Sequence, residues 1–141
     1  MTRKRTGKVA GPERSRAASG AEVRDWLDEV WRRTEAAVVL AGGDNGGPLA
    51  ERELIGEVFD AEDLAELRAL ITTGTFIDDI CRCFGSVTIA LLDAEGEFIG
   101  SGSVHGLTDV SWERSRFWNN LEVADPERLV GFLERHGVRM R

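Results

Sequence analysis

Two extended segments joined by a short acidic turn constrain this chain more than any other feature of its sequence. They are Val87–Leu92 and Phe98–His105, and the segment between them reads DAEGE. Gly96 in this segment suits the left-handed backbone position of a hairpin loop of about three to five residues. We therefore expect the two extended segments to pair as antiparallel strands.

The firmest helical pattern begins at Ser19, which forms a capping-box signature with Glu22. Residues on one stripe then recur at helical spacing: Val23, Trp26, Leu27, Val30, Trp31, Thr34 and Val38. Gly42 and Gly43 supply a stop signal. They open the segment GGDNGGP at 42–48, which we expect to be a loop that could hinge the first helix against the rest of the chain.

Two further helices and several strands complete the predicted fold. Asp60 can cap a helix that runs to about Ile71, and Asp125 followed by Pro126 has the residue order of a last helix, which Gly137 ends. Extended segments are expected at 54–59, 80–84 and 110–113. The sequence thus predicts an α+β fold in two layers, with a mostly antiparallel sheet of about four to five strands packed against three helices.

The formal net charge of −7 is unevenly distributed along the chain. Six basic residues lie within residues 1–20 and face only one acid, Glu13. We expect residues 1–19 to be a disordered basic tail and residues 20–141 to be a single domain with an acidic surface. Such a domain repels nucleic acid, which only the tail could contact, and attracts a basic protein. The absence of a long apolar segment predicts no membrane and a cytoplasmic location.

One cluster could hold a metal or a reactive thiol: Cys81, Cys83 and His105. Strand alternation would place both thiols on the same face, and zinc would then need a fourth ligand such as His136 or Asp79. In the alternative interpretation the thiols fill the core and the imidazole makes a structural hydrogen bond. This alternative needs no cofactor, and it is the one we favour.

Acidic side chains gather in two further places, at Glu57, Asp60, Glu62, Asp63 and Glu66 and again at Asp78 and Asp79. Several lie near a helix start, where the helix dipole is sufficient to explain them. They could also attract a basic partner by long-range electrostatics. With no complete catalytic set in the sequence, the leading hypothesis is a non-enzymatic protein-binding module of the immunity or antitoxin kind.

Gly100 and Gly102 would share one face of their strand and leave a shallow gap there. The surrounding IGSGSVHG lacks the lysine and the strand-to-helix setting of a phosphate loop. We expect an aromatic ring, that of Trp112 or Trp118, to fill the gap.

The second half of the chain resembles a family of small actinobacterial proteins. The resemblance lies in CRCFG at 81–85, LLDAEGEFIG at 91–100, VHG at 104–106 and the closing LVGFLERHGV. Those proteins carry a Cys-x-Cys-x-Gly-Asp strand, a hairpin, a His-His-Gly segment and a C-terminal helix. Here Ser86 replaces the usual Asp and Val104 replaces the first His. The resemblance implies a fold and no activity.

Overall fold

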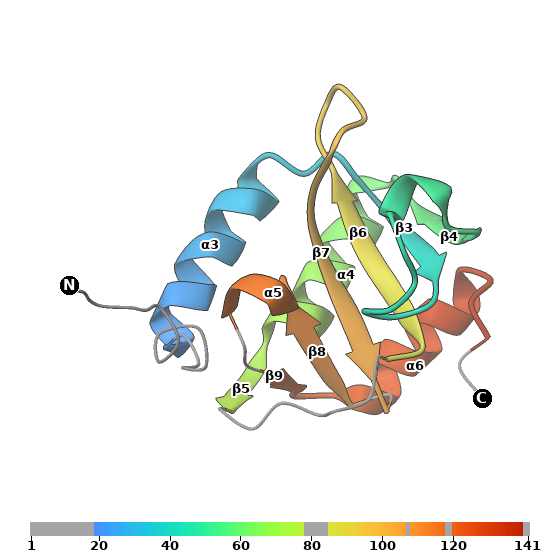
Figure 1. The fold of residues 1–141 in the computed structure, drawn as a ribbon. Helices are drawn as coiled ribbons and strands as arrows, with labels where there is room; N and C mark the ends of the chain where they lie inside the picture. The colour runs from blue at the N-terminus through green and yellow to red at the C-terminus, as the bar shows by residue number, and fades with distance from the viewer. Residues whose placement is uncertain (1–18, 78–84, 107, 118–119, 140–141) are drawn as a thin grey trace.

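The computed structural model describes residues 19–77, 85–106, 108–117 and 120–139 (Figure 1). The strands are β3 (Ala36–Ala41), β4 (Leu54–Val58), β5 (Gly74–Ile77), β6 (Val87–Leu92), β7 (Phe98–His105), β8 (Asp109–Trp112) and β9 (Asn120–Val123). Within the described residues these seven strands form one sheet in the order β4-β3-β6-β7-β8-β9-β5, with antiparallel neighbours throughout. The predicted α+β class is confirmed, whereas the expectation of four to five strands is wrong.

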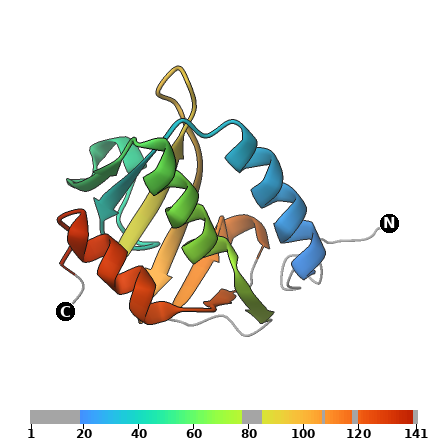
Figure 2. The same cartoon turned by 180° about the vertical axis from the view of Figure 1, so that it is seen from behind.

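The helices are α3 (Gly20–Arg32), α4 (Ala61–Thr72), α5 (Arg114–Phe117) and α6 (Pro126–Arg135), and a short 3-10 turn, η1, covers Leu49–Glu51. As Figure 2 shows, α3, α4 and α6 lie on the same side of the sheet. Each begins at a side-chain cap, from Ser19, Asp60 and Asp125 respectively. The predicted start of each of these three helices, based on its capping pattern, is therefore confirmed.

The central hairpin has the predicted bounds. β6 and β7 pair from Val87 opposite Val104 to Leu91 opposite Gly100, with one irregularity before Leu92. Gly96 in the connecting turn has a φ of 79°, the left-handed conformation that a glycine adopts without steric cost. The local pattern of alternation and turn chemistry was sufficient to define this unit.

The main core lies between the sheet and the helices, and two tryptophans fill the space over the β7 glycines. A Cβ at Gly102 would lie 2.9 Å from Cε3 of Trp112, and one at Gly100 would lie 3.1 Å from Cη2 of Trp26. The prediction of Trp112 as a filling ring is confirmed, while Trp118 lies outside the described residues. The contribution of Trp26 was not foreseen.

The first helix is shorter than predicted. α3 ends at Arg32, and the residues that follow Glu35 form β3 in the interior of the sheet. Four consecutive residues of β3 are buried because the strand is covered on both faces. A continuous apolar run of this kind fits a helix pattern as well as a strand pattern, so Val38 fell on the predicted helical stripe.

Two other strands were missed. β5 begins at Gly74, where a turn was expected, and pairs with β9, which was not predicted. Gly74 has a φ of 153°, and a side chain there would collide with the backbone of Glu122. The absence of a side chain at position 74 therefore allows β5 and β9 to approach each other closely. The predicted basic tail, as far as residue 18, and the whole of the extended segment predicted at 80–84 lie outside the described residues.

Candidate functional site: a polar sheet face and an acidic edge

Buried polar side chains gather on the face of the sheet that is turned away from the helices. They are Thr88, Ser103, His105, Ser111 and Asn120. The strand register places Thr88 opposite Ser103 and Ser103 opposite Ser111, so the hydroxyls form a row across β6, β7 and β8. Their strand neighbours Val104 and Val110 belong to the core on the helix side. The two faces of these strands thus differ sharply in polarity.

His105 lies within this polar face and is 3% exposed. Its Nε2 atom is 3.1 Å from Ser111 Oγ and 3.7 Å from Asp44 Oδ2. In a serine nucleophile triad the hydroxyl and the carboxylate contact opposite ring nitrogens, whereas here both contact the same one. Ser111 is also only 1% exposed, so its hydroxyl is shielded from a substrate. This trio fits a structural hydrogen-bond network better than a nucleophile.

The same network fixes the glycine-rich loop at 42–48 to the sheet. Ser103 Oγ donates to Asp44 Oδ1 over 2.7 Å. Arg52 donates from Nε to the Gly47 carbonyl over 2.9 Å and from Nη1 to Thr88 Oγ1 over 2.7 Å. The Thr88 hydroxyl in turn donates to the Gly42 carbonyl. The loop that the sequence suggested as a hinge is therefore held at several points.

Two of the three residues predicted to hold a metal, Cys81 and Cys83, lie outside the described residues. The described chain resumes at Gly85, where a Cβ would lie 3.4 Å from Cε1 of His105. The chain therefore comes close to this imidazole two residues after the second cysteine. The described residues alone contain no group of three or more His, Cys, Asp or Glu side chains that could hold a metal.

His136, the suggested fourth zinc ligand, lies elsewhere. It caps the C-terminus of α6, stacks on Phe132 at 4.4 Å between ring centroids, and lies 3.8 Å from Asp63 Oδ2. These contacts place it in the helix layer, while His105 lies on the opposite face of the sheet. The structure therefore gives no support to His136 as a ligand that joins His105.

Four of the predicted partner-binding acids lie in the edge strand β4 or shortly after it. Glu57 lies in β4, the outermost strand, and Asp60, Glu62 and Asp63 lie at the start of α4. The other two, Asp78 and Asp79, lie outside the described residues. The strand directly before them, β5, forms the opposite edge of the sheet. The register turns Glu57 toward the sheet face away from the helices, whereas the α4 acids belong to the helix layer, so the four acids lie near one edge of the sheet without sharing a face.

Some of these carboxylates have structural roles. Asp60 accepts hydrogen bonds from the backbone of Glu62 and Asp63 as the N-cap of α4. Glu66 pairs with Arg135 at 3.3 Å. By contrast, Glu57 and Glu62 form no ion pair with any residue in the described ranges. Their charges remain available to a partner.

Large apolar side chains accompany these acids, and sequence reasoning did not single them out. Phe59 is 60% exposed and Leu54 is 49% exposed, the highest values among the exposed large hydrophobic residues of the described chain. Leu54 is the first residue of β4, and Phe59 directly follows the last. The edge region of the chain that carries Leu54, Glu57, Phe59, Asp60 and Glu62 is called the acidic edge below. The signal in the sequence was the presence of apolar pairs between the acids of ELIGEVFD at 53–60.

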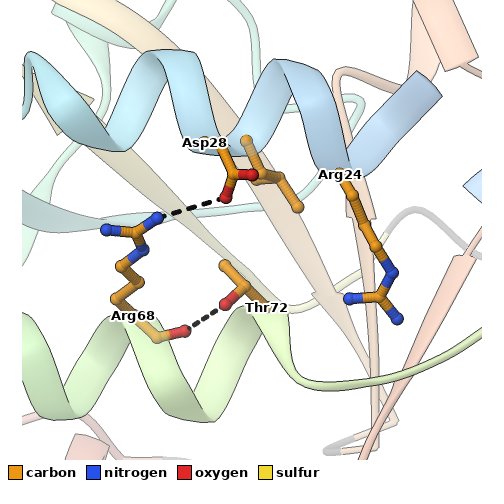
Figure 3. Close-up of a pocket in the computed structure, with 5 residues that line it drawn as sticks. Arg24, Asp28, Arg68 and Thr72 are labelled. Carbon is orange, nitrogen blue, oxygen red and sulfur yellow. Dashed lines mark hydrogen bonds and ion pairs between the residues drawn. The ribbon is translucent and has the colours of Figure 1, made fainter. Parts of the chain in front are cut away.

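A cavity of about 200 Å³ lies between α3 and α4 (Figure 3). Arg68 Nη2 contacts Asp28 Oδ1 at 3.2 Å across it. Arg24 lies at its other end, donates to the Gly74 carbonyl and stacks on the Phe76 ring. Both guanidinium groups thus already bind acceptors of this chain, so the contacts explain how two helices are joined and give no indication of a ligand.

In the part of the chain that the structure describes, no helix has the length and apolarity needed to span a membrane. No family model, no curated protein and no solved structure matches this chain, so the similarity to the actinobacterial proteins stays a prediction.

Proposed function

We propose that this protein is a non-enzymatic binding module that captures a basic protein partner through the acidic edge. The observation that carries the proposal is Phe59, a phenyl ring that is 60% exposed and that lies in the sequence between Glu57 and Glu62, two acids without an ion pair in the described chain. A ring in this position offers apolar contact area, and the acids around it favour a partner of opposite charge.

The charge around β4 supports this proposal. Residues 51–66 contain seven carboxylates and one basic residue, Arg52. The Arg52 guanidinium is turned toward the 42–48 loop and Thr88, where it donates its hydrogen bonds. The surface therefore presents mainly negative charge, which would raise the association rate of a basic protein at low ionic strength. We propose that the protein is of the immunity or antitoxin kind and that the complex is cytoplasmic.

Charge reversal on the acidic edge tests the proposal. The double variant Glu57→Lys/Glu62→Lys should lose a partner that the wild-type protein retains from a lysate at low salt. The matched control is Glu95→Lys/Glu97→Lys, which makes the same change in net charge on the exposed β6–β7 turn. The partner should be identified, purified and measured by calorimetry at two salt concentrations.

Selective loss with the edge variant, together with weaker binding of the purified partner at high salt, would support the proposal. Equal retention by the wild type and both variants would contradict it, because the acidic edge would then contribute nothing. Equal loss with both variants would also contradict it, since overall charge would then explain the capture.

A second candidate is a thiol or metal site at Cys81, Cys83 and His105. It is favoured by one observation, the return of the chain at Gly85 to within contact distance of the His105 ring. Elemental analysis of the untagged protein and the rate of cysteine alkylation test this candidate. A stoichiometric metal or an unusually fast thiol would support it, while a metal-free protein with slow thiols would exclude it.

A further inference from the structure

We infer that β4 binds an extended basic segment of the partner as an additional strand of the sheet. This inference rests on the proposed function and adds the mode of recognition. β4 is the outermost strand and pairs with β3 alone. The backbone groups on its other side point away from the sheet, as they do on every edge strand.

These backbone groups have no alternative partner in the described chain. Glu53, directly before the strand, accepts a hydrogen bond from Ala41. Beyond the ladder to β3, no hydrogen bond from the described residues reaches the backbone of Leu54–Val58. The segment after α6 lies close to part of the strand, since a Cβ at Gly137 would be 3.8 Å from the Ile55 carbonyl oxygen. An extended peptide could form main-chain hydrogen bonds along the remainder of this strand, as in known cases of strand addition.

The side chains of β4 specify the chemistry of the added strand. The register places Leu54 opposite Leu40 and Glu57 opposite Val38, so Leu54 and Glu57 lie on the sheet face away from the helices. An added strand would put its own side chains beside them at alternate positions. A basic residue would suit the position beside Glu57, and an apolar residue would suit the position near Leu54.

A second copy of this chain fits the edge less well. Pairing two β4 strands would bring the acids around each strand, Glu53 and Glu57, close to those of the other copy. Like charges at such positions are destabilising. Acidic residues on an edge strand are a common protection against self-association, but protection does not explain why Leu54 and Phe59 are exposed beside them.

The test uses the full chain and a labelled peptide of about nine residues in which Lys and Val alternate, long enough to span β4. A matched peptide carries N-methyl groups on its central amides, so that its charge and side chains are kept while neither of its edges can pair. Fluorescence anisotropy at low salt measures both affinities. Hydrogen exchange, with and without peptide, reports protection of the β4 amides.

Strand addition predicts that the unmodified peptide binds about tenfold or more tightly than the N-methylated one, since at least two backbone hydrogen bonds are lost. The β4 amides should also gain protection. Equal binding of both peptides, no binding at all, or protection confined to other segments would overturn the inference. Pairing of two copies of this chain through their β4 strands would also overturn the inference. The proposed function would survive each of these results if the edge variant still lost its partner.

Discussion

Ser103 Oγ donates a hydrogen bond to Asp44 Oδ1 over 2.7 Å, and this contact joins β7 to a loop that lies 59 residues earlier in the sequence. The other carboxylate oxygen faces Nε2 of His105 at 3.7 Å. Ser103 is 4% exposed, so water could not readily replace the Asp44 carboxylate as an acceptor if that carboxylate were removed. The variant Asp44→Ala should therefore lower the free energy of unfolding by about 1–3 kcal/mol, as measured by urea denaturation.

Asn45→Ala is the control for this prediction. Asn45 is the next residue of the same loop, it is exposed, and it forms no side-chain hydrogen bond with the described chain. Its substitution should change the stability by less than about 0.5 kcal/mol. Equal losses in the two variants would show that the loop tolerates neither change for reasons unrelated to the Ser103 contact.

Arg52 should hold the same loop from its other side. The variant Arg52→Ala removes donors to the Gly42 and Gly47 carbonyls and to Thr88 Oγ1, and should cost about 2 kcal/mol because these bonds involve a charged group. A double-mutant cycle with Asp44→Ala measures whether the two contacts act on one unit. We expect the double variant to lose less than the sum of the single losses, with a coupling of about 0.5 kcal/mol or more. Strict additivity would mean that the loop is held in two independent parts.

Local chemistry was enough to predict the hairpin of β6 and β7 and the start of each long helix. In these units the caps, the turn glycine and the alternation all lie within a few residues of one another. The sequence failed for β3, because a strand buried on both faces has no alternation to distinguish it from a helix. It failed for β5 and β9, which pair across more than 40 residues and contain only four residues each.

The candidate site was predictable only in part. The acids at 57 and 60–63 are close in sequence, so they lie near the same sheet edge, but the side to which Glu57 points depends on its register with β3. Burial of His105 followed from its place in an apolar strand, but its contacts with Asp44 and Ser111 depend on tertiary folding. The edge position of β4 is likewise a property of strand order, which alternation within a strand does not encode.

Gly102 should not tolerate a side chain. A Cβ there would lie 2.8 Å from Cγ1 of Val110 and 2.9 Å from Cε3 of Trp112, both of them buried. Gly102→Ala should therefore cost about 1–3 kcal/mol through overpacking. Gly131 in α6 provides the opposite case, since a Cβ there would have no neighbour within 4 Å. Gly131→Ala should raise the stability by about 0.5–1 kcal/mol through its helix propensity. Thermal unfolding of both variants checks the pair, and a stable Gly102→Ala protein would contradict the packing over β7.

The two buried tryptophans Trp112 and Trp31 should respond differently to the same substitution. The Nε1 atom of Trp112 donates to the Ile71 carbonyl over 3.1 Å, whereas the Nε1 atom of Trp31 is buried without a hydrogen-bond partner among the described residues. Replacement by Phe removes the indole donor and a similar apolar volume in both cases. Only at Trp112 does it also remove a hydrogen bond, and at Trp31 it relieves an unsatisfied donor.

We therefore expect Trp112→Phe to be more destabilising than Trp31→Phe by about 1–3 kcal/mol, as measured by urea denaturation of both variants under the same conditions. Near-ultraviolet circular dichroism should first establish that each variant keeps a packed core. Equal losses would mean that cavity formation outweighs hydrogen bonding at both sites. A larger loss at Trp31 would mean that its indole nitrogen has a partner in solution, such as a bound water, because an unpaired buried donor has nothing to lose.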